Sequence, residues 1–216
     1  MKTEYFTPAN IDHKGHQMLS RFVDFRRHHV LRYRPKESCL LVIDMQRYFL
    51  DEESHAFLPA APAIVPGILG LVKAYYVKKY PVVFTRHIND QHNAGMLAKW
   101  WDDIIPADDE ISALIPELPL EGATVITKTQ YDAFYQTDLD DQLKRNNVRQ
   151  VVITGVQTDL CCETTARSAF VRGYEVIIGI DATATENEDL HVASLSTLAH
   201  GFAIPVLAKE LLKYLV

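Results

Sequence analysis

The stretch Cys39-Leu-Leu-Val-Ile-Asp44 is a short aliphatic run that ends in a carboxylate. Its apolar residues are continuous rather than alternating, which is typical of a strand buried on both faces of a parallel sheet. Five further runs of this kind follow, at residues 81–86, 123–128, 150–155, 174–180 and 203–207. The last run contains Pro205, which has no N–H to donate to a neighbouring strand, so this strand is expected at a sheet edge.

Helical patterns separate these runs. Apolar residues recur at helical spacing over 64–75, and helices are also predicted over 139–143, over 161–172 before the stop at Gly173, and over 188–200. Strands that alternate with helices imply right-handed crossovers and a parallel sheet covered on both faces. We therefore predict a Rossmann-like α/β fold in which a six-stranded, mainly parallel sheet is the middle of three α/β/α layers.

Two segments fall outside this alternation, within what we expect to be a single domain over 1–216. Residues 1–38 form an N-terminal extension with a predicted helix over 17–28, and domain-edge packing or a subunit contact are both open as its role. Residues 87–122, here called the excursion, are rich in Asp and Pro. A connection this long is usually functional, so we interpret it as a lid or a subunit interface.

Composition excludes several classes of protein. The chain has 216 residues, a formal charge of 22 − 28 = −6 and 48% hydrophobic residues, which argues against a disordered chain and against a nucleic-acid binder. No apolar run reaches the ~20 residues of a membrane span, and residues 1–16 lack the apolar core of a signal peptide. Three cysteines fit a reducing compartment, so we expect a cytoplasmic protein.

Three residues of different chemistry follow or end predicted strands. Asp44 ends the first strand, Lys128 ends the third, and Cys161 follows the fourth at the start of a helix. Because ligands bind beyond the carboxyl ends of parallel strands, these side chains are expected to meet. Taken singly, the Asp is as compatible with a helix cap, the Lys with a solvated surface and the Cys with core packing.

Together the three residues make a coherent nucleophilic site. A helix N-terminus favours a thiolate at Cys161, Asp44 takes the thiol proton and later returns it to a leaving amine, and Lys128 keeps Asp44 ionised. Backbone N–H groups of the loop before the helix would stabilise the oxyanion. Cys162, one residue further on, and Cys39, at the opposite end of its strand, are assigned to packing.

Several motifs resemble those of the isochorismatase-like cysteine hydrolases. They are Leu41-Val-Ile-Asp-Met-Gln46, Lys128 followed by Tyr131 and Phe134, Gly155-Val-Gln-Thr-Asp-Leu-Cys161, Thr165-Ala-Arg-Ser-Ala169 and Asp181-Ala182. The resemblance runs from about residue 38 to the end of the chain. It implies an Asp44–Lys128–Cys161 triad, a cis peptide at Val156–Gln157, oxyanion donors at the N–H groups of Gln157 and Cys161, and a homo-oligomer, either a dimer or a tetramer.

The subfamily is left open by the residues. Nicotinamidases carry an Asp-x-His metal pattern after the second strand, whereas this chain has His87-Ile88-Asn89 there. We therefore predict no metal and no cofactor, and favour an interpretation of His87 and His92 as partly exposed loop residues. Metal binding by His87 or His92 stays open as the alternative. Isochorismatases have Gly then Cys where this chain has Cys161 and Cys162, which leaves their vinyl-ether chemistry, with Asp44 as acid, as an alternative.

Candidate pocket residues come from the segments after the strands. Tryptophan in the excursion suits either a pocket or a subunit interface, and the aromatic residues near Asp44 and Lys128 suit either pocket walls or the core. The predicted pocket residues are Gln46, Phe49, Trp100, Trp101, Tyr131 and Phe134.

The main hypothesis is a hydrolase that cleaves the C–N bond of a small amide or ureido substrate through a thioester on Cys161. Vinyl-ether hydrolysis is the first alternative, and a non-catalytic ligand-binding domain on the same fold is the second. In each case the partner is a small molecule, with no nucleic acid and no membrane.

Overall fold

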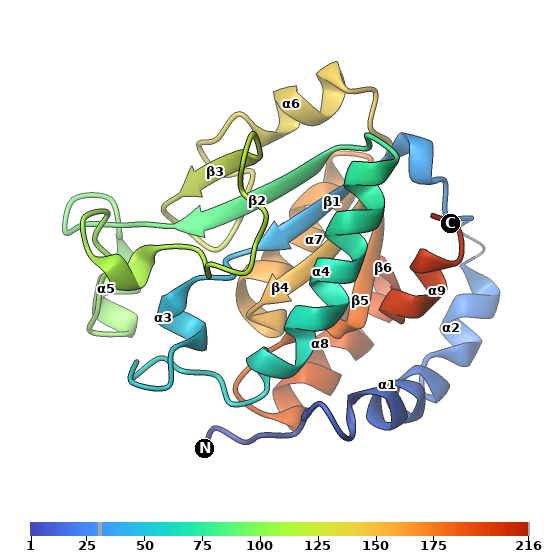
Figure 1. The fold of residues 1–216 in the computed structure, drawn as a ribbon, viewed down its shortest axis with the longest axis horizontal. Coiled ribbons are helices and arrows are strands. Elements are labelled where there is room, and N and C mark those ends of the chain that lie inside the picture. The colour runs from blue at the N-terminus through green and yellow to red at the C-terminus, as the bar shows by residue number, and fades with distance from the viewer. Residues whose placement is uncertain (30–31, 216) are drawn as a thin grey trace.

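The computed structural model describes residues 1–29 and 32–215. They form a six-stranded parallel sheet of order β3-β2-β1-β4-β5-β6 with helices on both faces, as Figure 1 shows. The predicted three-layer α/β architecture is confirmed. The strands are β1 (Ser38–Ile43), β2 (Val82–His87), β3 (Thr124–Lys128), β4 (Gln150–Val156), β5 (Glu175–Ala184) and β6 (Ala203–Val206).

Burial differs between the centre and the edges of the sheet. The central strands β1 and β4 are buried along their whole length. Strand β6, with Pro205, lies at one edge as predicted. Strand β3 forms the other edge, and its Thr124, Val125 and Thr127 are exposed. The expectation of burial on both faces is therefore wrong for β3, because the face that carries Val125 and Thr127 is exposed.

The long helix α4 crosses one face of the sheet, while α7 and α8 cover the other (Figure 1). The helix predicted over 17–28 is instead two helices, because the chain turns at Arg21 and buries the Phe22 ring in the core. The α-helices are α1 (Ile11–Ser20), α2 (Val23–His28), α3 (Arg47–Leu50), α4 (Ala61–Val77), α5 (Met96–Trp100), α6 (Leu139–Arg145), α7 (Glu163–Val171), α8 (Glu188–Gly201) and α9 (Ala208–Leu212), with 3₁₀ turns η1 (Pro35–Glu37) and η2 (Glu110–Ser112) and a π-helical turn η3 (Thr158–Cys162).

Polar contacts from the first two strands fix the excursion. Arg86 Nε donates to the Ser112 carbonyl at 2.8 Å, and Gln46 Nε2 donates to the same carbonyl at 2.8 Å. Gln46 also donates to the His87 carbonyl at 2.9 Å and accepts from the His87 N–H at 2.7 Å. The excursion is therefore held against the carboxyl ends of β1 and β2.

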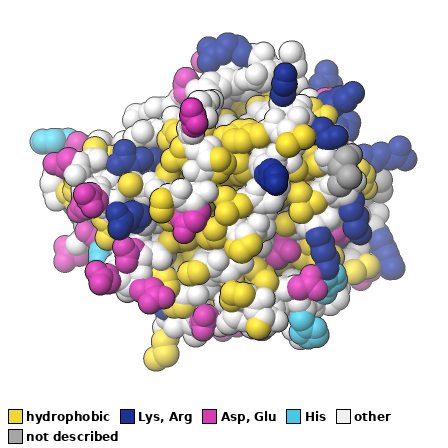
Figure 2. All heavy atoms as spheres, viewed as in Figure 1, with side chains coloured by type: hydrophobic (Ala, Val, Ile, Leu, Met, Phe, Trp, Pro, Cys, Tyr) yellow, Lys and Arg dark blue, Asp and Glu magenta, His cyan; other side chains and the backbone are white. Residues whose placement is uncertain are grey.

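The face that carries α4 has an apolar centre. Figure 2 shows hydrophobic side chains gathered over the middle of this face and acidic side chains gathered on the side of the excursion. Val65 and Leu69 of α4 are half-buried, and Val77 is exposed.

Among the residues described, none of the helices has both the length and the apolar character that a membrane span requires.

Candidate active site

Four neighbouring strands end at one place. In the order of the sheet, β3 ends at Lys128, β2 ends at His87, β1 is followed by Asp44, and β4 is followed by Gln157. Strands β1 and β4 are paired where the order in which the chain adds strands changes direction. In an open parallel sheet, ligands usually bind beyond the strand ends at this point. The fold therefore brings the predicted Asp and Lys together, with His87 from the strand between them.

Asp44 is held rigidly at the end of β1. Its φ of 47° lies in the left-handed region, which Asp adopts more readily than most residues. Its N–H donates to Thr85 Oγ1 at 3.1 Å, and the Thr85 hydroxyl donates to Asp44 Oδ1 at 2.6 Å. On the other side of β1, Gly155 lets β4 lie close to Ile43, because a Cβ at Gly155 would lie 2.0 Å from the Ile43 carbonyl oxygen. The carboxylate is fully buried.

Lys128 is a buried cation with four neighbours. Its Nζ lies 2.7 Å from Asp44 Oδ2, 2.9 Å from the Gln130 carbonyl, 3.2 Å from His87 Nδ1 and 3.4 Å from Cys161 Sγ. Burial alone lowers the pKa of Lys128, but the charge of Asp44 and the hydrogen bonds to Asp44 and Cys161 outweigh it and the pKa is raised. Lys128 is therefore an ammonium that bridges Asp44 and the thiol.

Cys161 lies in the η3 turn, immediately before α7, and its residue is 4% exposed. Burial raises the pKa of the Cys161 thiol to about 12, although Lys128 opposes this shift. The expectation that the helix N-terminus would favour a resting thiolate is thus corrected, because desolvation has the larger effect. The free protein holds a protonated thiol, and a base has to act when substrate binds.

His87 is the site residue that sequence reasoning placed wrongly. Rather than lying partly exposed in a loop, it is buried at the end of β2, and burial together with Lys128 lowers its pKa to about 3. One ring nitrogen of His87, a carboxylate oxygen of Asp44 and the Cys161 sulfur lie within 4.8 Å of one another. That trio could hold a metal ion by type, but the Lys128 ammonium already contacts all three. His92 is exposed in the excursion.

A cavity of about 290 Å³, here called the carboxyl-end cavity, opens over this group. The predicted residues Phe49, Trp101, Tyr131, Gln157 and Cys161 all line it, and Trp101 Nε1 donates to the Tyr131 hydroxyl at 2.6 Å. The Val156–Gln157 peptide beside it is cis. Further lining residues, which the sequence analysis had not assigned to a pocket, include Lys2, His55, His87, Asn89, Asp103 and Glu186.

Three predicted pocket residues do not line this cavity. The Gln46 side chain is buried, and its contacts to His87 and Ser112 anchor the excursion. Trp100 ends α5 and is 74% exposed on the outside. Phe134 packs beside Tyr174, with its ring under the Arg172 guanidinium. The expectation for these three is corrected, because none of them is among the residues that line the cavity.

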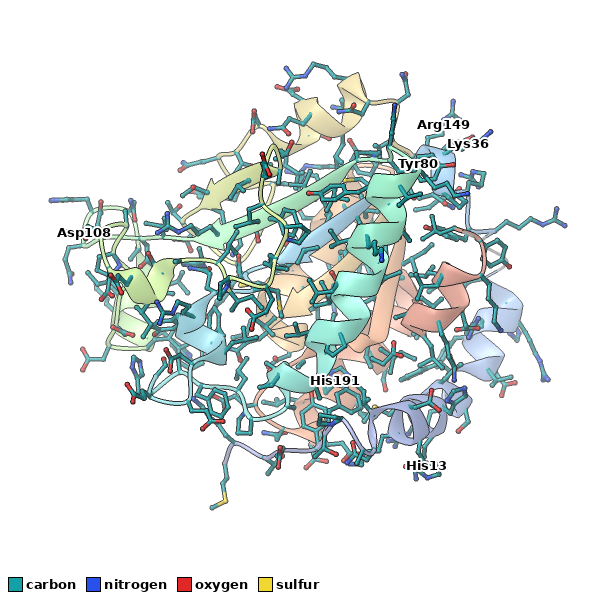
Figure 3. All side chains as sticks on the ribbon, in the orientation of Figure 1. His13, Lys36, Tyr80, Asp108, Arg149 and His191 are labelled. Carbon is teal, nitrogen blue, oxygen red and sulfur yellow. The ribbon has the colours of Figure 1, made fainter. Side chains whose placement is uncertain are left out.

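The N-terminal segment reaches the site, although no sequence pattern in this segment predicted that it would. Lys2 lines the cavity and donates from Nζ to the His55 carbonyl at 2.7 Å, and the Thr3 N–H donates to the Glu186 carbonyl at 2.8 Å. The rings of Tyr5 and Phe6 pack against His191, which Figure 3 labels beside this segment. His191 Nδ1 lies 2.8 Å from the hydroxyl of Thr158, the first residue of η3.

The other two cysteines lie outside the cavity. Cys162 is fully buried with its sulfur toward the Thr154 carbonyl, and burial raises its pKa well above the usual value. Cys39 is buried in β1 at the far end of the sheet. Neither is a member of the lining, which leaves Cys161 as the cavity's thiol.

Comparison with known proteins agrees with this arrangement. A family model described as Isochorismatase domain matches residues 38–210. Nicotinamidase 3 of Arabidopsis thaliana is 39% identical over 173 residues, which are 78% of this chain and 83% of that protein. Enterobactin synthase component B of Escherichia coli (strain K12) is 29% identical over 83% of this chain, which spans 64% of that protein.

A solved structure has the same fold. The cysteine hydrolase from Pseudomonas syringae pv. phaseolicola 1448A superposes with a TM-score of 0.81 at 26% identity, over 86% of this chain and 96% of that one. The matched domain covers the sheet and every strand end described above. This chain therefore belongs to the isochorismatase domain family of hydrolases.

Proposed function

We propose that the protein is a cysteine hydrolase that cleaves the C–N bond of a small amide or ureido compound through a thioester on Cys161. The observation that carries this proposal is the buried Asp44–Lys128–Cys161 group opening into a cavity of about 290 Å³. The cavity suits a small substrate, and its aromatic wall of Phe49, Trp101 and Tyr131 suits a planar one.

The first half of the reaction forms the thioester. Asp44 accepts the thiol proton as the Cys161 sulfur attacks the substrate carbonyl, so the negative charge moves from the carboxylate to the sulfur. The Lys128 ammonium contacts both groups and stabilises the charge in either position. The backbone N–H groups of Gln157 and Cys161, both at the cavity wall, are proposed to stabilise the oxyanion.

The second half releases the products. Asp44 returns its proton to the leaving nitrogen as the C–N bond breaks, and ammonia or an amine departs. A water molecule then loses a proton to Asp44 while its oxygen attacks the thioester carbonyl. The C–S bond breaks, the proton returns to the sulfur, and the carboxylic acid or carbamate product leaves.

Vinyl-ether hydrolysis with Asp44 as the acid is the alternative reaction at this site. The 2.7 Å ion pair with Lys128 stabilises a negatively charged Asp44, which favours its action as a base. The alternative would need no thiol, so it predicts that Cys161→Ala stays active. Family membership favours either hydrolase over a non-catalytic ligand-binding domain.

The test is ammonia release from a panel of small amides and ureido compounds by the wild type, Cys161→Ala and Cys162→Ala. We expect Cys161→Ala to be inactive with an unchanged far-ultraviolet circular dichroism spectrum. Cys162→Ala is the matched control, since it removes the neighbouring thiol, which lies outside the cavity. An active Cys161→Ala protein would sink the thioester mechanism.

We further propose, from the family resemblance, a homo-oligomer in the cytoplasm that is built from one domain over 1–216. The apolar centre of the α4 face in Figure 2 supports an association of subunits. Sedimentation at micromolar concentration tests the oligomer, and a monomer over the whole range would contradict it.

A further inference from the structure

His87 and Asn89 present two hydrogen-bond donors to each other in the wall of the carboxyl-end cavity. His87 Nδ1 lies 3.2 Å from the Lys128 ammonium, which can only donate, so Nδ1 must be the acceptor. Because burial and Lys128 keep His87 neutral, its single ring proton is left on Nε2. His87 Nε2 is therefore an N–H donor.

The orientation of the Asn89 amide is fixed independently. Its Oδ1 accepts from the Ile105 N–H at 2.7 Å, while the Asn89 N–H donates to the Ile105 carbonyl at 3.0 Å. Its Nδ2 therefore faces His87 Nε2 at 3.1 Å. An amide nitrogen only donates, so two donors point at one region with no acceptor between them.

The position of this donor pair, His87 Nε2–H and Asn89 Nδ2–H, indicates where its acceptor must come from. The two residues are 5% and 4% exposed, and both line the cavity that Cys161 lines. Within residues 1–29 and 32–215, neither nitrogen has another hydrogen-bond partner. Buried donors without acceptors are costly, so a bound molecule that supplies an acceptor gains affinity.

The charge around the pair favours a neutral acceptor. Both donors are uncharged, and the nearby Lys128 is already paired with Asp44 at 2.7 Å. A carboxylate placed here would lose its hydration without gaining a cation of its own. An sp² ring nitrogen or a carbonyl oxygen matches the site without that cost.

We propose that His87 and Asn89 form a specificity site that binds a neutral hydrogen-bond acceptor of the substrate, and that the enzyme selects small amides carrying such an acceptor besides the scissile carbonyl. This proposal rests on the proposed amide hydrolysis and names its substrate class. The acceptor lies in the same cavity as the reacting carbon, because His87, Asn89 and Cys161 all line it.

Matched substrate pairs test this selection. Benzamide is compared with the pyridine-2-, pyridine-3- and pyridine-4-carboxamides, and butanamide with malonamide, so that a ring nitrogen and a carbonyl oxygen are separate arms. We expect kcat/KM of the best acceptor-bearing amide to exceed that of its isostere by at least about tenfold. Equal kcat/KM values within both pairs would overturn the proposal.

Asn89→Asp removes the donor while keeping the bond to Ile105. One carboxylate oxygen still accepts from the Ile105 N–H, and the other accepts from His87 Nε2–H and closes the site. The ratio of kcat/KM for the acceptor-bearing amide to that for its isostere should fall toward one. Asn93→Asp is the matched control, because it makes the same charge change on an exposed residue of the same excursion. A preference that survives in Asn89→Asp, or a loss equal for all amides, would refute a specificity role.

Two measurements remain decisive if no amide is turned over, which would be a failure of the proposed function alone. Calorimetric titration of Cys161→Ala with each matched pair reads the same preference as a ratio of Kd values, and equal Kd values would overturn the proposal. A ¹⁵N–¹H spectrum of labelled protein, with His87→Asn used for assignment, should show the Nε2–H form of His87. An Nδ1–H form would equally overturn it.

Discussion

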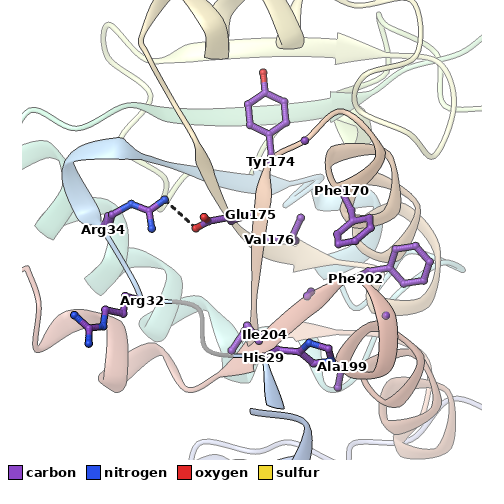
Figure 4. Close-up of a pocket in the computed structure, with 13 residues that line it drawn as sticks. His29, Arg32, Arg34, Phe170, Tyr174, Glu175, Val176, Ala199, Phe202 and Ile204 are labelled. Carbon is purple, nitrogen blue, oxygen red and sulfur yellow. Dashed lines mark hydrogen bonds and ion pairs between the residues drawn. The ribbon is translucent and has the colours of Figure 1, made fainter. Parts of the chain in front are cut away.

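Two cavities lie at opposite ends of the sheet, and the larger one lacks the chemistry. The amino-end cavity, about 530 Å³, is lined by the first residues of β5 and β6 and by Phe170 and Phe202, as Figure 4 shows. The carboxyl-end cavity, about 290 Å³, holds Cys161. Size therefore does not identify the functional cavity in this protein.

The difference between the two cavities is the environment of their charges. In the amino-end cavity Arg34 and Glu175 pair at 3.0 Å with side chains 38% and 40% exposed, so water screens them. Lys128 and Asp44 pair at 2.7 Å with side chains that are 0% exposed. The buried pair therefore has the stronger electrostatic interaction, because water that would screen its charges is excluded.

The largest effect is expected at the buried pair. Asp44→Asn removes the proposed base, so hydrolysis should fall by about 10²–10⁴-fold. Ammonia release at saturating substrate measures it. Hydrolysis within a few-fold of the wild type would show that the buried pair is structural and would remove the contrast between the cavities.

The same variant should change thiol reactivity in the opposite direction. Burial raises the pKa of Cys161 to about 12, and the charge of Asp44 contributes to the rise. Wild-type alkylation by iodoacetamide should therefore increase about tenfold per pH unit from pH 7 to 10, since only the thiolate reacts. Asp44→Asn lowers this pKa and should react faster at each pH; slower alkylation would contradict the electrostatic account.

The next largest effect is expected on the free energy of unfolding, which should distinguish the buried ion pair from an exposed one. Lys128→Met leaves Asp44 buried without its cation and should cost about 3–5 kcal/mol in the free energy of unfolding. Lys144→Met is the matched control, because Lys144 pairs with Asp140 at the surface, also at 2.7 Å, and should cost less than about 0.5 kcal/mol. Urea unfolding measures both, and equal costs would break the comparison.

A smaller effect is expected from the two adjacent tryptophans. Trp101→Leu removes a cavity wall and the 2.6 Å bond to the Tyr131 hydroxyl, so KM should rise about tenfold. Trp100→Leu changes the exposed neighbour and should leave KM within about twofold. Steady-state kinetics on one substrate decide this, and a larger effect at Trp100 would place the substrate elsewhere.

The smallest effect is expected in the amino-end cavity. Phe170→Ala enlarges that cavity at a half-exposed ring and should leave kcat/KM within about twofold. A tenfold loss would show that the larger cavity takes part in the reaction after all.

Part of the site could be predicted because its signals are local. Asp44 and Lys128 end continuous apolar runs, and Cys161 begins a helical pattern, so the rule for parallel sheets brings them together. His87 also ends a strand, but its importance depends on β2 lying between β1 and β3. Strand order is set by long-range packing, which no local pattern in the sequence encodes.

The direction of side chains was the other feature of the site that could not be predicted from the sequence. Gln46 lies only two residues after Asp44, yet the left-handed φ of Asp44 helps to direct the chain so that Gln46 turns toward Ser112. Trp100 and Trp101 are neighbours whose exposure is decided by the last turn of a five-residue helix. No periodic pattern is long enough there to tell the two apart.

The position of Lys2 has a consequence for assigning substrates among relatives. The family model spans residues 38–210, whereas the cavity wall includes Lys2, which lies outside it. Two paralogues with identical residues 38–210 but different leading segments would have different cavity walls. Substrate specificity therefore cannot be inferred for one family member from another by the shared domain alone. An alignment that begins at β1 omits part of the cavity wall.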